Sequence, residues 1–153
     1  MHQFNLIFYE KKLILQRKEI FKTTKENLWN ALTDLNLMKQ WYFKEINFFE
    51  SKIGSKTLFS IEYEGKKFTH KWYVFEVIPK EKIAYHWQYE EYAGDSTVTF
   101  ELKEVKYVIL LTLTARILDP FPEMKEFSYE SMNKGWETLL KVRLKQFVEH
   151  KIH

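Results

Sequence analysis

The sequence predicts an α+β fold in which a curved antiparallel sheet wraps around a long C-terminal helix. Apolar residues recur at every second position from residue 46 to 118 and at helical spacing from residue 126 to 150. Phe, Tyr and Trp make up 18% of the 153 residues, and so many rings need a bulky interior. The predicted order is one strand, two short helices, six strands and one long helix.

The first elements are predicted from local signals. Residues 13–22 (LILQRKEIFK) alternate moderately and predict a strand. Thr23 and Glu26 form a capping box that starts a short helix, and Asp34 can cap a second one. The apolar residues expected on the inner sides of these helices are Leu28, Trp29, Leu32, Leu37, Met38 and Trp41.

A run of strands follows the two helices. Turn signals at Gly54, Gly65 and Gly94 separate alternating segments, and Pro79 ends the longest of them. Because consecutive hairpins pair neighbouring strands, they predict an antiparallel sheet. The predicted strands are Ile46–Phe49, Thr57–Tyr63, Lys67–Ile78, Ile83–Tyr89, Thr97–Leu102 and Tyr107–Leu118.

The last predicted element is a helix over Glu126–His150, which follows a break at Asp119–Pro122 (DPFP). At about 1.5 Å per residue this helix is roughly 37 Å long. An apolar stripe of that length needs a sheet to cover it. The stripe consists of Met132, Trp136, Leu139, Leu140, Leu144 and Phe147.

Composition excludes several classes of function. The 24 basic and 21 acidic residues are mixed along the chain and leave a net charge of +3, so we expect no nucleic-acid partner. The absence of cysteine excludes disulfides, thiol catalysis and thiolate metal sites. The longest stretches without acidic or basic residues, 1–9 and 107–115, are too short to span a bilayer. We expect one cytoplasmic domain over 1–153, with 1–12 as an irregular N-terminal extension.

Four segments carry a resemblance to a known superfamily: KTTKENLWNALTD at 22–34 with Trp41, EVIPKEKI at 76–83 with His86-Trp87, STVTFEL at 96–102, and Gly135-Trp136 with Leu139 and Leu140. In this order they resemble the START-like (SRPBCC, helix-grip) superfamily, and within it the branch named after the activator of the Hsp 90 ATPase. The chain departs from that pattern at Thr23 and Thr24, where a proline usually precedes the first helix. The resemblance implies a helix-grip fold, a scaffold that hosts cyclases, lipid carriers, hormone receptors and co-chaperone domains.

A helix-grip fold implies a cavity between sheet and helix. One interpretation is an apolar ligand pocket with a few polar groups, and the alternative is that the rings fill the space. The candidate lining and ligand-binding residues are Phe59, Ile61, Tyr63, Phe68, His70, Trp72, Tyr85, Trp87, Phe100, Leu111, Leu113, Phe121, Met132 and Trp136.

Two of these residues, His70 and Phe121, have alternative roles, and so do Gly135 and Met124. His70 alternates with inward rings and can act as acid, base or ligand anchor, or it is a partly exposed strand histidine. Gly135 either lets a ligand approach the helix backbone or packs closely on the sheet beside Trp136. Phe121 and Met124 either form a lid or cover the end of the helix within a connector that is stiffened by proline.

Three functions are therefore weighed. The first is a non-enzymatic domain that binds a small hydrophobic molecule. The second, implied by the resemblance, is a protein–protein module that contacts a chaperone of the Hsp 90 class. The third is a cyclase-like or dehydratase-like enzyme, which needs His70, Tyr63 or Tyr85 to converge. No catalytic motif or metal-ligand spacing is present, so we expect no cofactor and no metal. We expect a monomer or a weak dimer.

Overall fold

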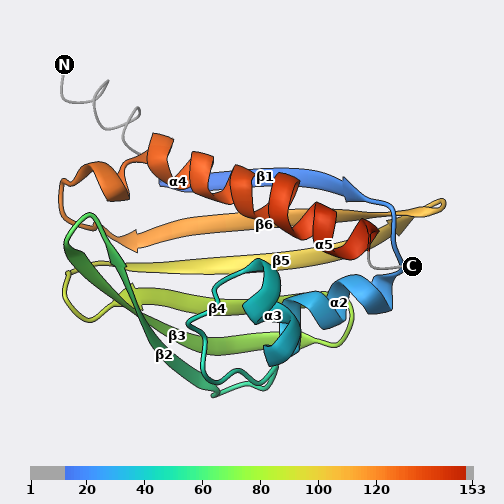
Figure 1. The fold of residues 1–153 in the computed structure, drawn as a ribbon, viewed down its shortest axis with the longest axis horizontal. Coiled ribbons are helices and arrows are strands. Elements are labelled where there is room, and N and C mark those ends of the chain that lie inside the picture. Colours follow the sequence, from blue (N-terminus) through green and yellow to red (C-terminus); the bar gives the residue numbers. More distant parts are fainter. Residues whose placement is uncertain (1–12, 151–153) are drawn as a thin grey trace.

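The computed structural model describes residues 13–150, which form an antiparallel sheet crossed by a long C-terminal helix (Figure 1). The predicted extension at 1–12 lies outside the described residues. The strands are β1 (Ile14–Phe21), β2 (Lys56–Tyr63), β3 (Lys66–Ile78), β4 (Lys82–Tyr89), β5 (Asp95–Val105) and β6 (Val108–Asp119). The sheet order is β1-β6-β5-β4-β3-β2, so the first strand pairs with the last and both lie beside the helix.

The helices confirm the predicted α+β helix-grip fold. Two short helices, α2 (Lys25–Thr33) and α3 (Leu35–Trp41), follow the first strand. The C-terminal helix runs without a break through α4 (Tyr129–Glu137), a π-helical segment (Thr138–Leu144) and α5 (Lys145–Glu149). A short 3-10 turn at Lys125–Phe127 precedes it, and the Ser128 hydroxyl caps its first turn.

Two local predictions are wrong in detail. Residues Ile46–Phe49 form no strand, although Ile46 and Phe49 are buried. The apolar residues of this segment are buried in a loop. Alternation over so few residues does not show that the segment pairs with another strand. The cap of α2 is Thr24 and not Thr23, since the Thr24 hydroxyl accepts from the Asn27 amide at 3.0 Å. Asp34 caps α3 as predicted.

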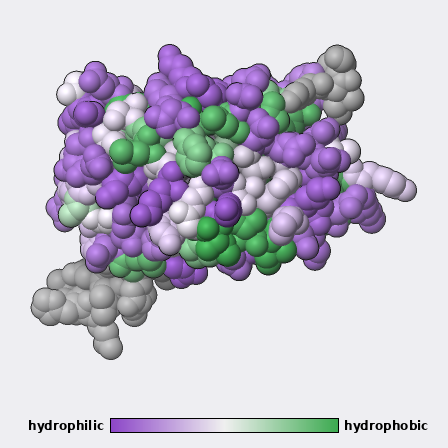
Figure 2. Space-filling view, turned by 90° about the horizontal axis from the view of Figure 1, so that it is seen from below, coloured by the Kyte–Doolittle hydropathy of each residue, from purple (hydrophilic) through white to green (hydrophobic). Residues whose placement is uncertain are grey.

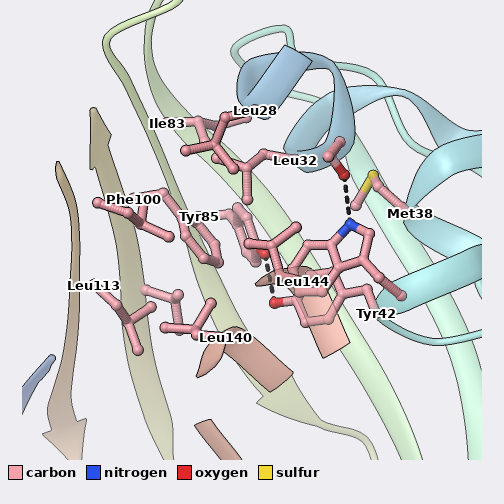
Figure 3. Packing of buried hydrophobic residues seen from close by; sticks show 14 of the residues in the cluster. Leu28, Leu32, Met38, Tyr42, Ile83, Tyr85, Phe100, Leu113, Leu140 and Leu144 are labelled. Carbon is pink, nitrogen blue, oxygen red and sulfur yellow. Dashed lines mark hydrogen bonds between the residues drawn. The ribbon is translucent and has the colours of Figure 1, made fainter. Parts of the chain in front are cut away.

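The core is filled at the end of the sheet that α2 and α3 cover. Figure 3 shows side chains from α2, from the sheet and from the C-terminal helix meeting there. The hydroxyls of Tyr42 and Tyr85 lie 2.7 Å apart inside this cluster. The Trp41 indole N–H donates to the Ala31 carbonyl at 2.7 Å. These contacts satisfy buried polar atoms of three rings, whereas the buried Trp72 indole N–H has no hydrogen-bond partner among residues 13–150.

Polar contacts hold the C-terminal helix along β1 at two places. Arg17 donates to the Asn133 side chain at 2.8 Å and to Glu19 at 3.0 Å. Farther along, the Glu149 carboxylate accepts from the Lys22 backbone amide at 2.8 Å. These contacts hold both the α4 part and the α5 part of the helix beside β1. The apolar side of the helix therefore faces the sheet.

The outer surface is mainly polar. Figure 2 views the molecule from the side of β2 and shows hydrophilic residues over most of that face, with hydrophobic residues in separate patches. Exposed apolar side chains of β2 and the preceding loop include Phe48, Ile53 and Leu58. Within residues 13–150, no helix has both the length and the apolar character needed to cross a membrane.

Candidate ligand-binding cavity

A cavity of about 650 Å³ lies between α4 and the sheet, at the end away from α2. Strands β2 to β6 supply one wall, and α4 with the connector before it supplies the other. The lining residues are mostly apolar or aromatic: Phe43, Tyr63, His70, Trp87, Tyr89, Ser96, Val98, Ala115, Ile117, Phe121, Glu126, Phe127, Met132, Gly135, Trp136, Thr138 and Leu139.

The cavity exists because the C-terminal helix turns large apolar side chains toward the sheet in its later part but a glycine in its earlier part. The later part presents Leu140, Leu144 and Val148, which are fully buried against the sheet and α2. The part over the cavity presents Gly135, where a built Cβ would meet nothing within 4 Å. The interpretation of Gly135 as a close-packing residue is therefore wrong, and its missing side chain adds open space.

Six of the fourteen predicted residues line this cavity: Tyr63, His70, Trp87, Phe121, Met132 and Trp136. The other eight lie outside its lining. Six of these are held in the filled core, and Tyr42, which ends α3, contacts three of the six. The Tyr42 ring stacks on Trp72 at 5.2 Å and meets the edge of Phe100 at 6.4 Å. The eight residues are Phe59, Ile61, Phe68, Trp72, Tyr85, Phe100, Leu111 and Leu113.

Several lining residues were not among those predicted. Tyr89, Val98 and Ala115 lie on inward positions of their strands, so extending the alternation to the strand ends would have found them. Phe43 comes from an irregular segment, where sequence periodicity gives no signal. Glu126 was predicted to start the helix but lies in the 3-10 turn Lys125–Phe127, since α4 begins only at Tyr129. The remaining residues outside the predicted list are Ser96, Ile117, Phe127, Thr138, Leu139 and Gly135, and the last of these was considered as a point of ligand approach to the helix.

His70 is the central polar group of the sheet wall. Its side chain is only 5% exposed, and its ring stacks on Phe59 at 4.6 Å. Nδ1 lies 3.1 Å from the Phe68 carbonyl oxygen. A carbonyl can only accept, so Nδ1 carries the proton and Nε2 is a bare acceptor. Burial lowers the pKa of His70 to about 4, so the ring is neutral at pH 7.

A carboxylate lies at the opposite wall. Glu126 lines the cavity with a side chain that is 10% exposed. One oxygen, Oε2, accepts from Lys66 Nζ at 2.9 Å, and this contact lowers the pKa of Glu126. The other oxygen, Oε1, is buried and has no hydrogen-bond partner within residues 13–150.

Two ion pairs join the β2–β3 turn to the 3-10 turn before α4. Besides Lys66 and Glu126, Lys125 and Glu64 pair at 3.1 Å. Lys66 is 42% exposed, so this side of the cavity reaches the surface. These pairs span the gap between sheet and connector and define the rim of the cavity.

The connector between β6 and α4 also contributes to the rim. Phe121 lies over Gly94, where a Cβ would overlap its ring, so this turn needs a glycine to admit Phe121. A second cavity of about 450 Å³ lies beyond, and Phe121, Phe127 and Met132 line both. Met124, the other residue of the predicted lid, lines only the second cavity.

The groups named for an enzyme do not all converge. His70 and Tyr63 line the same cavity, but Tyr85 is fully buried and is paired with Tyr42 in the filled core. Burial raises the pKa of Tyr89, a further lining hydroxyl, to about 12, so it stays protonated. Across the part of the chain that the structure describes, no three His, Asp or Glu side chains gather to hold a metal ion.

Comparisons with known proteins agree with this architecture. Residues 22–149 match the family described as activator of Hsp90 ATPase homolog 1-like protein. No curated protein sequence matches the chain.

Solved structures share the fold at low sequence identity. Protein MLL2253 from Mesorhizobium loti is 22% identical with a TM-score of 0.75, and the match covers 92% of this chain and 99% of that one. Protein CV1439 from Chromobacterium violaceum is 17% identical with a TM-score of 0.75, covering 90% and 97%. The Aha1 dimer from Colwellia psychrerythraea is 18% identical with a TM-score of 0.66, covering 92% and 98%.

Proposed function

We propose, from the premise that the chain belongs to the family of activator of Hsp90 ATPase homolog 1-like proteins, that it binds a small, largely apolar molecule between α4 and the sheet. Binding alone is proposed, without a chemical step. Of the fourteen predicted ligand-binding residues, the proposal keeps the six that line the cavity and can touch a ligand.

The observation that carries this proposal is the cavity itself. Its volume of about 650 Å³ lies within the range of about 300–1,000 Å³ that is typical of small-molecule sites. Its wall is mainly apolar and aromatic, with a few polar groups that converge on the space, which is the usual composition of such sites. A ligand there would cover rings that otherwise face solvent through the rim.

The environment of His70 favours binding over catalysis. A histidine base is usually oriented by a carboxylate and placed beside a nucleophile. Here Nδ1 bonds to the Phe68 backbone carbonyl, and Nε2 has no hydroxyl partner within residues 13–150. Nε2 is therefore available to a ligand as an acceptor.

A cavity-filling variant tests the proposal. Gly135→Leu introduces a good helix former whose side chain enters open space, so the fold should persist while the cavity shrinks. Lys134→Leu places the same side chain at the neighbouring exposed position and is the matched control.

Amide chemical shifts of isotope-labelled protein would be followed while apolar and aromatic compounds are added. We expect shifts at residues 94–98 and 126–136 in the unmodified chain and in the control, and their loss in Gly135→Leu. Unchanged binding by Gly135→Leu, or the absence of shifts with every compound, would contradict the proposal.

A second candidate function is a co-chaperone-like contact with another protein. The family description favours it, because it names an activator of Hsp90 ATPase, and one similar solved structure is that of an Aha1 dimer. The exposed apolar side chains of Phe48, Ile53 and Leu58 offer a surface that is separate from the cavity lining.

The test of this candidate is the ATPase rate of an Hsp90-class chaperone with excess protein. Stimulation that is lost in Ile53→Lys but kept in Gly135→Leu would support a surface contact. An unchanged rate with excess unmodified protein would count against it.

A further inference from the structure

We infer that the cavity selects neutral aromatic molecules that carry a hydrogen-bond donor, such as a phenol, and discriminates against carboxylates of the same apolar bulk. The inference rests on the proposed binding function and assigns it a ligand class. It follows from the kind of polar atom on each wall, from the charges around the cavity and from the rings between them.

Besides the hydroxyls of Tyr63, Tyr89 and Thr138, the lining offers three acceptor atoms. Nε2 of His70 is bare because Nδ1 donates to the Phe68 carbonyl. Oε1 of Glu126 is buried and, among the described residues, has no donor. The Ser96 hydroxyl uses its proton on the Trp87 carbonyl at 2.8 Å, so it too offers lone pairs. A ligand that leaves buried acceptors unmatched loses affinity, so a ligand with a donor is favoured.

The charge around the cavity disfavours an anion. The lining contains no lysine or arginine, and His70 is neutral. The one charged lining group is the Glu126 carboxylate, whose ion-pair partner Lys66 lies at the rim and is already engaged. A bound carboxylate would therefore lose its hydration without gaining a cation, which is strongly unfavourable in a poorly solvated site.

The rings between these groups favour a flat ligand. Trp87 and Trp136 meet edge to face at 5.5 Å on opposite walls. Phe43 lies 5.3 Å from the His70 ring, and Tyr89 lies 4.8 Å from it. Aromatic ligands gain from such faces and edges. Because the stack with Phe59 already fixes the His70 ring, its acceptor needs no reorganisation on binding.

Three probes with one ring system separate these effects: 1-hydroxypyrene, 1-methoxypyrene and pyrene-1-carboxylate. Their binding would be measured at pH 7 by pyrene emission and checked by calorimetry. We expect 1-hydroxypyrene to bind about tenfold more tightly than 1-methoxypyrene, since one hydrogen bond to a buried acceptor is worth about that factor. We expect pyrene-1-carboxylate to bind more weakly than either.

Two histidine variants test the assigned acceptor. His70→Phe keeps a ring in the stack and removes Nε2, so the preference for the hydroxyl over the methoxy probe should fall to about one. His86→Phe is the matched control, because His86 lies outside the cavity lining and bonds Asp95 at 3.0 Å. It should retain the preference of the unmodified chain.

A third variant tests the charge. Glu126→Gln removes the negative charge from the wall and should narrow the gap between the carboxylate and the methoxy probe.

The outcomes separate this inference from the proposed function. If no probe binds, the binding function itself fails. If all three bind with equal affinity, or if the carboxylate binds best, the cavity binds ligands but the assigned class is wrong. These comparisons need only the unmodified chain, so they hold even where a variant folds poorly.

Discussion

Acidification should destabilise this protein, and the contribution of a single side chain, His70, can be isolated. In the folded chain His70 is 5% exposed, and desolvation lowers its pKa to about 4 from an ordinary value of 6.5. The Phe68 carbonyl and the nearby Glu91 carboxylate oppose this effect only in part. The unfolded chain therefore takes up this proton at a higher pH than the folded chain does.

The direction and size of the effect follow from linkage. Stability is unaffected by His70 above about pH 6.5, falls as the pH drops toward 4, and stops falling below the folded pKa. The full effect is about 3 kcal/mol, since each pKa unit is worth about 1.4 kcal/mol. At pH 5 roughly 2 kcal/mol of it should already be lost.

Urea unfolding followed by tryptophan fluorescence measures this loss at pH 7.5, 6, 5 and 4.5. Two non-titrating variants, His70→Phe and His70→Gln, isolate the group, because all other titrating groups are shared. Between pH 7.5 and pH 5 the unmodified chain should lose about 2 kcal/mol more than either variant. Profiles that run parallel to within about 0.5 kcal/mol would refute the assignment of a buried neutral imidazole.

Three further changes have expected outcomes in thermal or urea unfolding. Gly94→Ala should lower the free energy of unfolding by roughly 1–3 kcal/mol and expose Phe121 to solvent. Residue 94 has a φ of +122°, and a Cβ there would overlap the Phe121 ring. An unchanged unfolding midpoint would contradict this. Arg17→Met should cost about 1–3 kcal/mol by leaving the Asn133 side chain without its donor, with faster amide exchange in α4 as the local readout. Leu144→Ala should cost about 2–5 kcal/mol, since Leu144 is fully buried, and a loss below about 1 kcal/mol would argue against tight packing there.

The order and direction of neighbouring strands could be predicted from the sequence, because each hairpin joins strands that follow each other in the chain. Gly65 and Gly94 mark turns whose flanking strands pair with their neighbours, so order and direction follow from the chain. The pairing of β1 with β6 joins residues such as Phe21 and Ile109, which are far apart in the sequence. No local pattern reports such a contact, so this pairing was not predicted from the sequence.

The cavity was predicted less well, because alternation tells which way a strand residue faces but not what covers it. Trp72 and Phe100 face inward as predicted, yet Tyr42 at the end of α3 covers them. His70 faces the same way and remains open to the cavity. The difference depends on where a non-periodic loop and the helix lie. Phe43, for example, reaches the cavity from a loop for which the sequence gives no pattern.

The division of the molecule into a packed end and a hollow end has an evolutionary consequence. Side chains such as Leu140 and Leu144 secure the fold, while Tyr63 and Met132 border empty volume. Substitutions in the second group can change what fits inside while removing few of the contacts that keep the chain folded. Selection can thus adapt this scaffold to new small molecules without first acquiring compensating stabilising mutations.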